Sequence, residues 1–205
     1  MTVDSDPGFR IIPPDPPRSP EAAEFFRSHP EFIVSDSLAF LAKHYPDTSQ
    51  WIIDSGVAIQ ALTGHRDGYP SDIDVVSLSP RMEADFGHSN GIDPADRRYI
   101  DVKSIDHWLL GRGSGLTDPP SLWPYIVALS LPRNIEGHFV RIMHPAIIAA
   151  GKSTMAKMTQ RPKDVADLEL LAVEPEQLQA ATELLRGNDL ERQFRLLQQH
   201  PSLRL

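Results

Sequence analysis

Residues 50–78 contain a short apolar segment, a turn into an amphipathic helix and a second apolar segment, in that order. The run QWIID at 50–54 is apolar and too short for a helix, which indicates a buried strand. The following SGVAIQALTG has the apolar spacing of a helix, with a glycine near its start. SDIDVVSL at 71–78 again predicts a strand. A chain with this order is expected to build its core from a sheet with helices packed on it.

The rest of the chain changes character at Pro145. Before it, alternating segments at 97–105 and 138–143 predict two more strands, and residues 35–44 predict a helix that packs on the sheet. After it, the sequence as far as Leu205 has helical spacing only and predicts three or four short helices.

We therefore expect three parts along the chain. Residues 1–18 are rich in proline and poor in large apolar residues, so they should stay flexible. A serine cap followed by proline predicts a helix start near residue 19, where a core at 19–145 begins. Residues 146–205 form a C-terminal helical region. The predicted fold class is α/β (α+β), with a short mixed β-sheet flanked by helices.

Composition excludes several kinds of protein. The 205 residues include no cysteine, which rules out disulfides, zinc ribbons, iron–sulfur clusters and thiol nucleophiles. A formal net charge of −8 argues against a protein whose main task is to bind long nucleic acid through its phosphates. No apolar run reaches the roughly 18 residues of a membrane span, and the N-terminus lacks the features of a secretory signal. We expect a cytoplasmic protein that does not enter a membrane.

The strongest chemical signal is an Asp-x-Asp pair in the second predicted strand. Asp72 and Asp74 are two positions apart, so both should project to one face of the strand. Neighbouring carboxylates repel unless a cation lies between them, and oxygen ligands of this kind suit Mg²⁺. Asp101 on the third predicted strand could complete a two-metal site, with Asp106 as the alternative. For an isolated pair, the plainer interpretation is a strand cap and a solvated charge.

A phosphate site is predicted upstream of this pair. Ser55 and Gly56 open a helix with small side chains and free backbone N–H groups, which favour a bound phosphate. The later GKST at 151–154 looks like the end of a phosphate-binding loop. Helix-forming residues precede it where that loop requires glycine, so we expect Lys152 to lie on a helix.

Together these motifs resemble the nucleotidyltransferase fold of the DNA polymerase β superfamily. GVAIQALTGHR…SDIDVV is similar to the Gly-Gly-x-Ala and Arg-x-(Thr/Ser)-x-Asp-x-Asp motifs of its minimal bacterial members, with Ser55 in place of the first glycine. Lys152 and RPKDVADL at 161–168 are similar to the lysine helix and the Arg/Lys-Asp-x-x-Asp-Leu signature of AbiEii-type and MenT-type toxin nucleotidyltransferases. The resemblance covers roughly residues 50–171.

The resemblance implies transfer of NMP from an NTP to an acceptor hydroxyl, with release of pyrophosphate. It implies a Mg²⁺ site, with two ions, formed by Asp72, Asp74 and Asp101. It implies a nucleotide site, for ATP or another NTP, formed by Ser55, Gly56, Arg66 and Lys152. Toxin relatives act on tRNA and have a cognate antitoxin, antibiotic-resistance relatives modify small molecules, and other minimal members modify protein hydroxyls. The resemblance leaves the acceptor open among these three.

Several residues keep two interpretations. Lys152 could be an ordinary solvated lysine, and Asp164 could orient it, act as a base, or merely compensate charge at a helix N-terminus. The fold could also serve as a non-catalytic binding module. The histidines lack metal-ligand spacing, and we expect all three tryptophans in the core or an interface, namely Trp51, Trp108 and Trp123. A docking face for tRNA could form from the basic residues Lys152, Lys157, Arg161 and Lys163.

Overall fold

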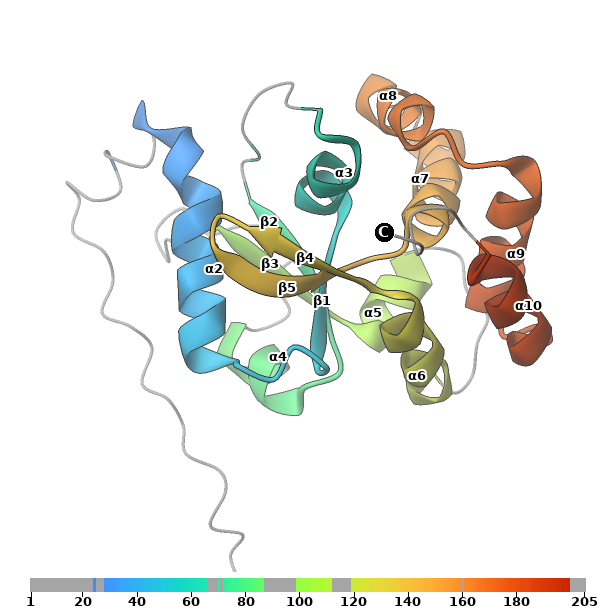
Figure 1. Ribbon diagram of the computed structural model, residues 1–205, viewed down its shortest axis with the longest axis horizontal. Helices are drawn as coiled ribbons and strands as arrows, with labels where there is room; N and C mark the ends of the chain where they lie inside the picture. Colours follow the sequence, from blue (N-terminus) through green and yellow to red (C-terminus); the bar gives the residue numbers. More distant parts are fainter. Residues whose placement is uncertain are drawn as a thin grey trace, which may run out of the picture.

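The computed structural model describes residues 24, 28–65, 70, 72–86, 99–111, 119–159 and 161–199. The fold is α/β: a five-stranded mixed sheet is flanked by helices and followed by a C-terminal helical region (Figure 1). The proline-rich segment and the predicted helix start near residue 19 lie outside the described residues.

The sheet has the strand order β3-β2-β1-β5-β4. Strand β1 runs antiparallel to β2, and β5 runs antiparallel to β4, whereas the pairs β2–β3 and β1–β5 are parallel. Four of the five strands lie where the sequence predicts them. The strands are β1 (Trp51–Asp54), β2 (Ile73–Ser77), β3 (Ile100–Ser104), β4 (Leu131–Ile135) and β5 (His138–Ile142).

Helices pack around the sheet, and the last four form the C-terminal region, on the right in Figure 1. Helix α3 directly follows β1 and leads back to β2, as the apolar spacing predicts. The helical segments are η1 (Pro30–Phe32), α2 (Ile33–His44), α3 (Ser55–Thr63), α4 (Pro80–Phe86), α5 (Ile105–Gly111), α6 (Pro119–Leu129), α7 (Pro145–Thr159), α8 (Pro162–Leu171), α9 (Pro175–Leu185) and α10 (Leu190–Leu197).

The hairpin of β4 and β5 contains the one strand in the described residues that the sequence did not predict. Its two-residue turn, Glu136 and Gly137, has positive φ at both positions, at 49° and 85°, as a type I′ turn requires. Glutamate is not one of the residues that usually mark such a turn, and Pro132 interrupts the strand pattern. Proline is tolerated because β4 lies at the edge of the sheet.

Strand β2 begins two residues later than predicted, and this corrects the position of Asp72. Asp72 lies in a bend before the strand, and only Asp74 is part of it. The reason is that β1 ends at Asp54, opposite Asp74, and turns into α3 there, so no residue of β1 remains to pair with Asp72. The prediction that Asp72 belongs to this strand is therefore wrong.

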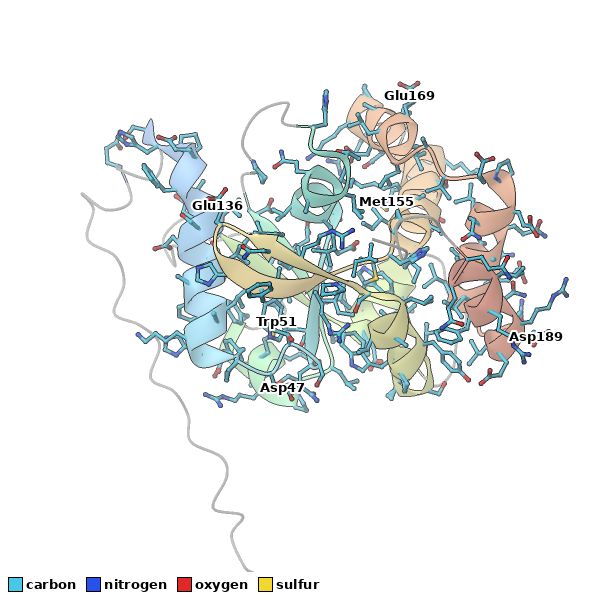
Figure 2. The ribbon with its side chains drawn as sticks, in the orientation of Figure 1. Asp47, Trp51, Glu136, Met155, Glu169 and Asp189 are labelled. Carbon is cyan, nitrogen blue, oxygen red and sulfur yellow. The ribbon has the colours of Figure 1, made fainter. Side chains whose placement is uncertain are left out.

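A single cluster of buried apolar side chains joins the sheet to the C-terminal helices. It extends from Leu38 on α2 to Leu197 on α10. Figure 2 shows Trp51 in the interior and Glu169 and Asp189 on the outer surface of the helical region. The helices after Pro145 thus share their core with the strands, and this packing fixes α7 and α8 relative to the ends of β1, β2 and β3.

Candidate functional site

Three aspartates lie side by side where strands β1, β2 and β3 meet the surface. Asp54 pairs in register with Asp74 across the antiparallel pair, and Asp74 pairs with Asp101 across the parallel pair. Side chains at paired positions of neighbouring strands share a face of the sheet. Three carboxylates therefore converge at this point, and Asp54 is one that the sequence analysis did not select.

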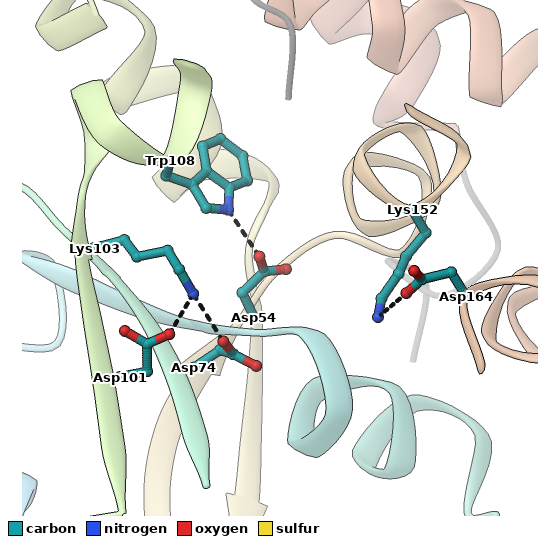
Figure 3. A network of polar contacts seen from close by, with 7 residues as sticks. All are labelled: Asp54, Asp74, Asp101, Lys103, Trp108, Lys152 and Asp164. Atoms are coloured by element: carbon teal, nitrogen blue, oxygen red, sulfur yellow. Dashed lines mark hydrogen bonds and ion pairs between the residues drawn. The ribbon is translucent and has the colours of Figure 1, made fainter. Parts of the chain in front are cut away.

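Lys103 lies between two of these carboxylates. Its Nζ donates to Asp74 Oδ1 at 3.0 Å and to Asp101 Oδ2 at 2.6 Å (Figure 3). Lys103 is two residues after Asp101 on β3, so both side chains project from the same face of that strand. The alternation Asp-x-Lys was the sequence signal for this contact. The Asp-x-Asp pattern predicts a metal ion that balances the charge of the aspartates, whereas in the structure a lysine lies between Asp74 and Asp101.

Burial and charge shift the ionisation of this group. Burial raises the pKa of Asp74, Lys103 opposes that rise, and the negative charges of Asp54 and Asp72 add to it. Burial by itself would lower the pKa of Lys103, but Asp74 and Asp101 outweigh it and hold that pKa well above its usual range. Lys103 is therefore a permanent cation at neutral pH, and the group keeps a surplus of negative charge.

A tryptophan fixes the buried Asp54. Trp108 Nε1 donates to Asp54 Oδ2 at 2.7 Å, and the two residues are only 3% and 2% exposed. Trp108 lies on α5, which follows β3 directly, so the same chain segment carries Asp101, Lys103 and this indole. The prediction that Trp108 is buried is confirmed, but its indole N–H also holds a carboxylate of the site.

The turn from β1 into α3 is strained at its first residue. Ser55 has φ of 54°, in the left-handed region that residues with a Cβ rarely adopt. At the next position, a Cβ on Gly56 would meet no other atom within 4 Å. Both residues line a cleft, so the backbone at the start of α3 faces open space. The space beside Gly56 is compatible with the phosphate role predicted for this turn.

A second buried ion cluster lies on the C-terminal helices. Lys152 Nζ on α7 contacts Asp164 Oδ1 at 2.9 Å and Asp167 Oδ2 at 2.8 Å, both on α8. The lysine side chain is 13% exposed and the two carboxylates are 2% and 11% exposed. Burial opposes the charge of Lys152, but the hydrogen bonds and charges of Asp167 and Asp164 raise its pKa.

This cluster excludes one alternative for Lys152 and agrees with one of the alternatives for Asp164. Lys152 is largely buried, so it is not an ordinary solvated lysine. Asp164 holds it directly, as the orienting role predicts, and Arg161 Nε lies 3.8 Å from the other Asp164 oxygen. Lys152 also lies on α7, which confirms that its GKST sequence belongs to a helix.

The two groups line one cleft of about 570 Å³. One wall is formed by the strand ends and the start of α3, and the other by α7 and α8 (Figure 3). His65 and His107, two of the histidines that lack metal-ligand spacing in the sequence, also line it. The predicted site residues on its walls are Ser55, Gly56, Asp72, Asp74, Asp101, Lys152 and Asp164.

The remaining predicted residues lie elsewhere. Asp106 is exposed on α5 and does not line the cleft, whereas Asp101 is next to Asp74, so the geometry favours Asp101 as the third carboxylate. Arg66 lies outside the described residues. Asp72 lines the cleft from the bend before β2, although it is not part of that strand.

A metal ion fits these carboxylates only if Lys103 moves. Among the described residues, no three His, Asp or Glu side chains converge closely enough to hold a metal ion as they stand. The donors are of the type that Mg²⁺ prefers, and Asp101 Oδ1 is buried without a hydrogen-bond partner in the part of the chain that is described. Lys103 Nζ takes the place of a cation bridging Asp74 and Asp101.

Comparison of the chain with family models, with curated proteins and with solved structures returned no match. Within the described residues, no helix combines the length and the hydropathy needed to cross a bilayer.

Proposed function

We propose that this protein is a metal-dependent nucleotidyltransferase that transfers NMP from an NTP to an acceptor hydroxyl and releases pyrophosphate. The observation that carries the proposal is the placement of Asp74 and Asp101 across the cleft from Lys152, with Ser55 and Gly56 on the same cleft. These are the residues that the nucleotidyltransferase motifs select. Segments far apart in the sequence supply them, which an accidental motif match would not predict.

Each wall of the cleft has a separate part in the proposed reaction. Ser55 and Gly56 offer backbone N–H groups at the start of α3 to the phosphates. Lys152, held in place by Asp164 and Asp167, lines the opposite wall, where its ammonium N–H groups would donate to the phosphates. Asp74, Asp101 and Asp72 would hold Mg²⁺, which when bound neutralises charge on the phosphates. The acidic cleft thus binds a triphosphate together with its cation.

The reaction needs no protein nucleophile. The acceptor oxygen attacks the α-phosphorus in line, a new oxygen–phosphorus bond forms, and the bond to the bridging α–β oxygen breaks. Pyrophosphate carries the electron pair away, and a carboxylate at the strand ends accepts the hydroxyl proton, a role that we assign to Asp101 on the wall of the cleft. Positioning and charge provide the catalysis.

We further propose a toxin-type enzyme that acts on tRNA and has a cognate antitoxin. The basic residues Lys157 on α7, Arg161 just before α8 and Lys163 on α8 are exposed, and the latter two line the cleft. Lys152 does not contribute to such a face, because it is already neutralised by two carboxylates. Binding of tRNA should weaken steeply with salt, whereas a small-molecule acceptor such as an antibiotic should show little dependence.

The direct test is transfer of a labelled nucleotide. Purified protein with Mg²⁺, NTP labelled at the α-phosphate and total tRNA should yield labelled RNA, and Asp74→Asn should abolish the product. Asp106→Asn is the matched control, because it removes the same charge from an exposed position outside the cleft. Wild-type protein that binds neither NTP nor divalent metal would refute the proposal.

A second candidate function follows from Lys103. An ammonium that satisfies Asp74 and Asp101 could replace the metal permanently, which would make the cleft a metal-independent binding module. Such a protein would bind nucleotide equally well with Mg²⁺ or with a chelator, and it would gain no thermal stability from Mg²⁺. Measurement of nucleotide affinity under both conditions distinguishes the two functions.

A further inference from the structure

We propose that Lys103 is an internal counter-ion that a divalent metal must displace from Asp74 and Asp101, and that the displaced ammonium then binds the nucleotide phosphates. This inference rests on the proposed function and assigns a role to a residue that the motifs do not include. Lys103 would be a positioning residue that couples metal binding to nucleotide binding.

The ammonium of Lys103 lies between Asp74 and Asp101. Lys103 Nζ is 2.6 Å from Asp101 Oδ2 and 3.0 Å from Asp74 Oδ1, so one cation bridges the two strands. The register places Asp74 beside Asp101, and the two-residue offset places Lys103 on the same face. In the absence of metal, Lys103 therefore keeps these carboxylates together and lowers their repulsion.

The second step is competition for the same oxygens. A magnesium ion held by these carboxylates would need oxygens at about 2.0–2.1 Å. An ammonium that stays in hydrogen-bond contact with both would then be a few ångströms from a dication, where like charges repel strongly. Lys103 and the metal therefore exclude each other, and binding of the metal requires the lysine side chain to swing away.

The third step is the destination of the ammonium. Lys103 has a flexible four-carbon stem, is one-third exposed and lines the same cleft as Ser55 and Gly56. A triphosphate at the start of α3 would be a new anion within this cleft. Metal binding without nucleotide leaves the ammonium without that anion, so the metal should bind weakly alone and more tightly when nucleotide is present.

The test measures the two ligands separately. Binding of Mn²⁺ alone is followed from the free-ion signal in electron paramagnetic resonance, and binding of α,β-methylene ATP is followed by calorimetry at saturating Mg²⁺. Lys103→Met removes the charge and keeps the length of the side chain, and Lys103→Arg keeps the charge. Lys43→Met removes a charge from an exposed position on α2 and serves as the matched control.

The expected result is a pair of opposite effects. Lys103→Met should bind Mn²⁺ at least about tenfold more tightly than wild type, because a positive charge about 3 Å from the ligand oxygens is gone. The same variant should bind the ATP analogue more weakly. Lys103→Arg and Lys43→Met should stay close to wild type in both measurements. If Lys103 had only a structural role, its removal would not tighten the binding of Mn²⁺.

Two different failures can be told apart. If Lys103→Met binds Mn²⁺ no more tightly than wild type while the ATP analogue still binds, the role of Lys103 is refuted and the proposed function survives. If neither ligand binds to wild type or to any variant, both are refuted.

Should Lys103→Met not fold, Lys103→Gln and the wild-type protein still decide the matter. The glutamine variant also lacks the charge and should bind Mn²⁺ more tightly than wild type. In wild type, the ¹⁵N signal of the Lys103 ammonium should shift when saturating Mg²⁺ is added together with the ATP analogue. An unchanged signal at full occupancy would refute the proposal.

Discussion

Replacement of Lys152 by methionine tests how the wall formed by α7 and α8 is held. The change removes the ammonium between Asp164 and Asp167 but keeps the length of the side chain. Asp164 is 2% exposed and Asp167 is 11% exposed, so neither carboxylate can recover its hydration without local opening. Loss of one partner of a buried ion pair costs about 3–5 kcal/mol, and we expect the free energy of unfolding at pH 7 to fall by that amount.

Urea denaturation followed by tryptophan fluorescence measures this loss. Lys157→Met, an exposed lysine on the same helix, is the matched control and should change stability by no more than about 0.5 kcal/mol. Adding Asp164→Asn and Asp167→Asn to Lys152→Met should recover part of the loss, because the uncompensated charges are then absent.

The contribution of Lys152 to the free energy of unfolding should fall at high pH. The pKa of Lys152 is raised in the folded protein. Its contribution to stability is therefore complete below the unfolded pKa of about 10.4 and is lost as pH rises through the higher folded pKa. The difference between wild type and Lys152→Met should be constant from neutral pH to about pH 10 and shrink above that. A cost below about 1 kcal/mol at pH 7, or no recovery with the two asparagines, would refute the reasoning.

Two further predictions concern the opposite wall. Ser55→Gly should raise the free energy of unfolding by up to about 1 kcal/mol. The left-handed conformation costs a residue with a Cβ about 1–2 kcal/mol, and part of this gain is offset because glycine loses more backbone entropy on folding. Ser55→Ala keeps the strain and should show no gain in the same urea titration. Burial raises the pKa of Asp74, so the ionised side chain is unfavourable in the folded protein. Any stability that Asp74 contributes is present below about pH 3.9 and is lost as pH rises through its folded pKa. Asp74→Asn should therefore be more stable than wild type at pH 7. The gain should disappear in urea titrations near pH 3, and an unstable Asp74→Asn at pH 7 would contradict it.

The sequence predicted the sheet well where its signals are local. Strand β1, helix α3 and strand β2 follow from apolar spacing, and the change to helices at Pro145 is visible in the helical spacing of the residues after it. Strand β4 was missed because the turn that joins it to β5 uses Glu136, and because tolerance of Pro132 depends on the edge position of β4. An edge position is a property of the complete sheet, and local sequence does not contain it.

The candidate site was predicted less evenly. Asp74, Asp101 and Lys152 were selected from motifs, and the structure brings them to one cleft. Lys103 was not predicted, although its offset from Asp101 places both on one face, because the metal-site pattern contains the anionic ligands and not their counter-ion. Asp54 was missed because it ends an apolar run, and its partner Trp108 is 54 residues away in the chain.

The exposed turn at Glu136 and Gly137 separates the two walls of the cleft along the chain. Asp74 and Lys103 precede it, and Lys152 and Asp164 follow it, while the apolar core spans both sides. A backbone cut in this turn would yield two fragments, and neither would contain the whole cleft. Each fragment would expose apolar surface that packs against the other fragment in the intact protein. Reassembly of the pieces would restore the cleft, which makes this loop the natural place to divide the protein into a complementation pair.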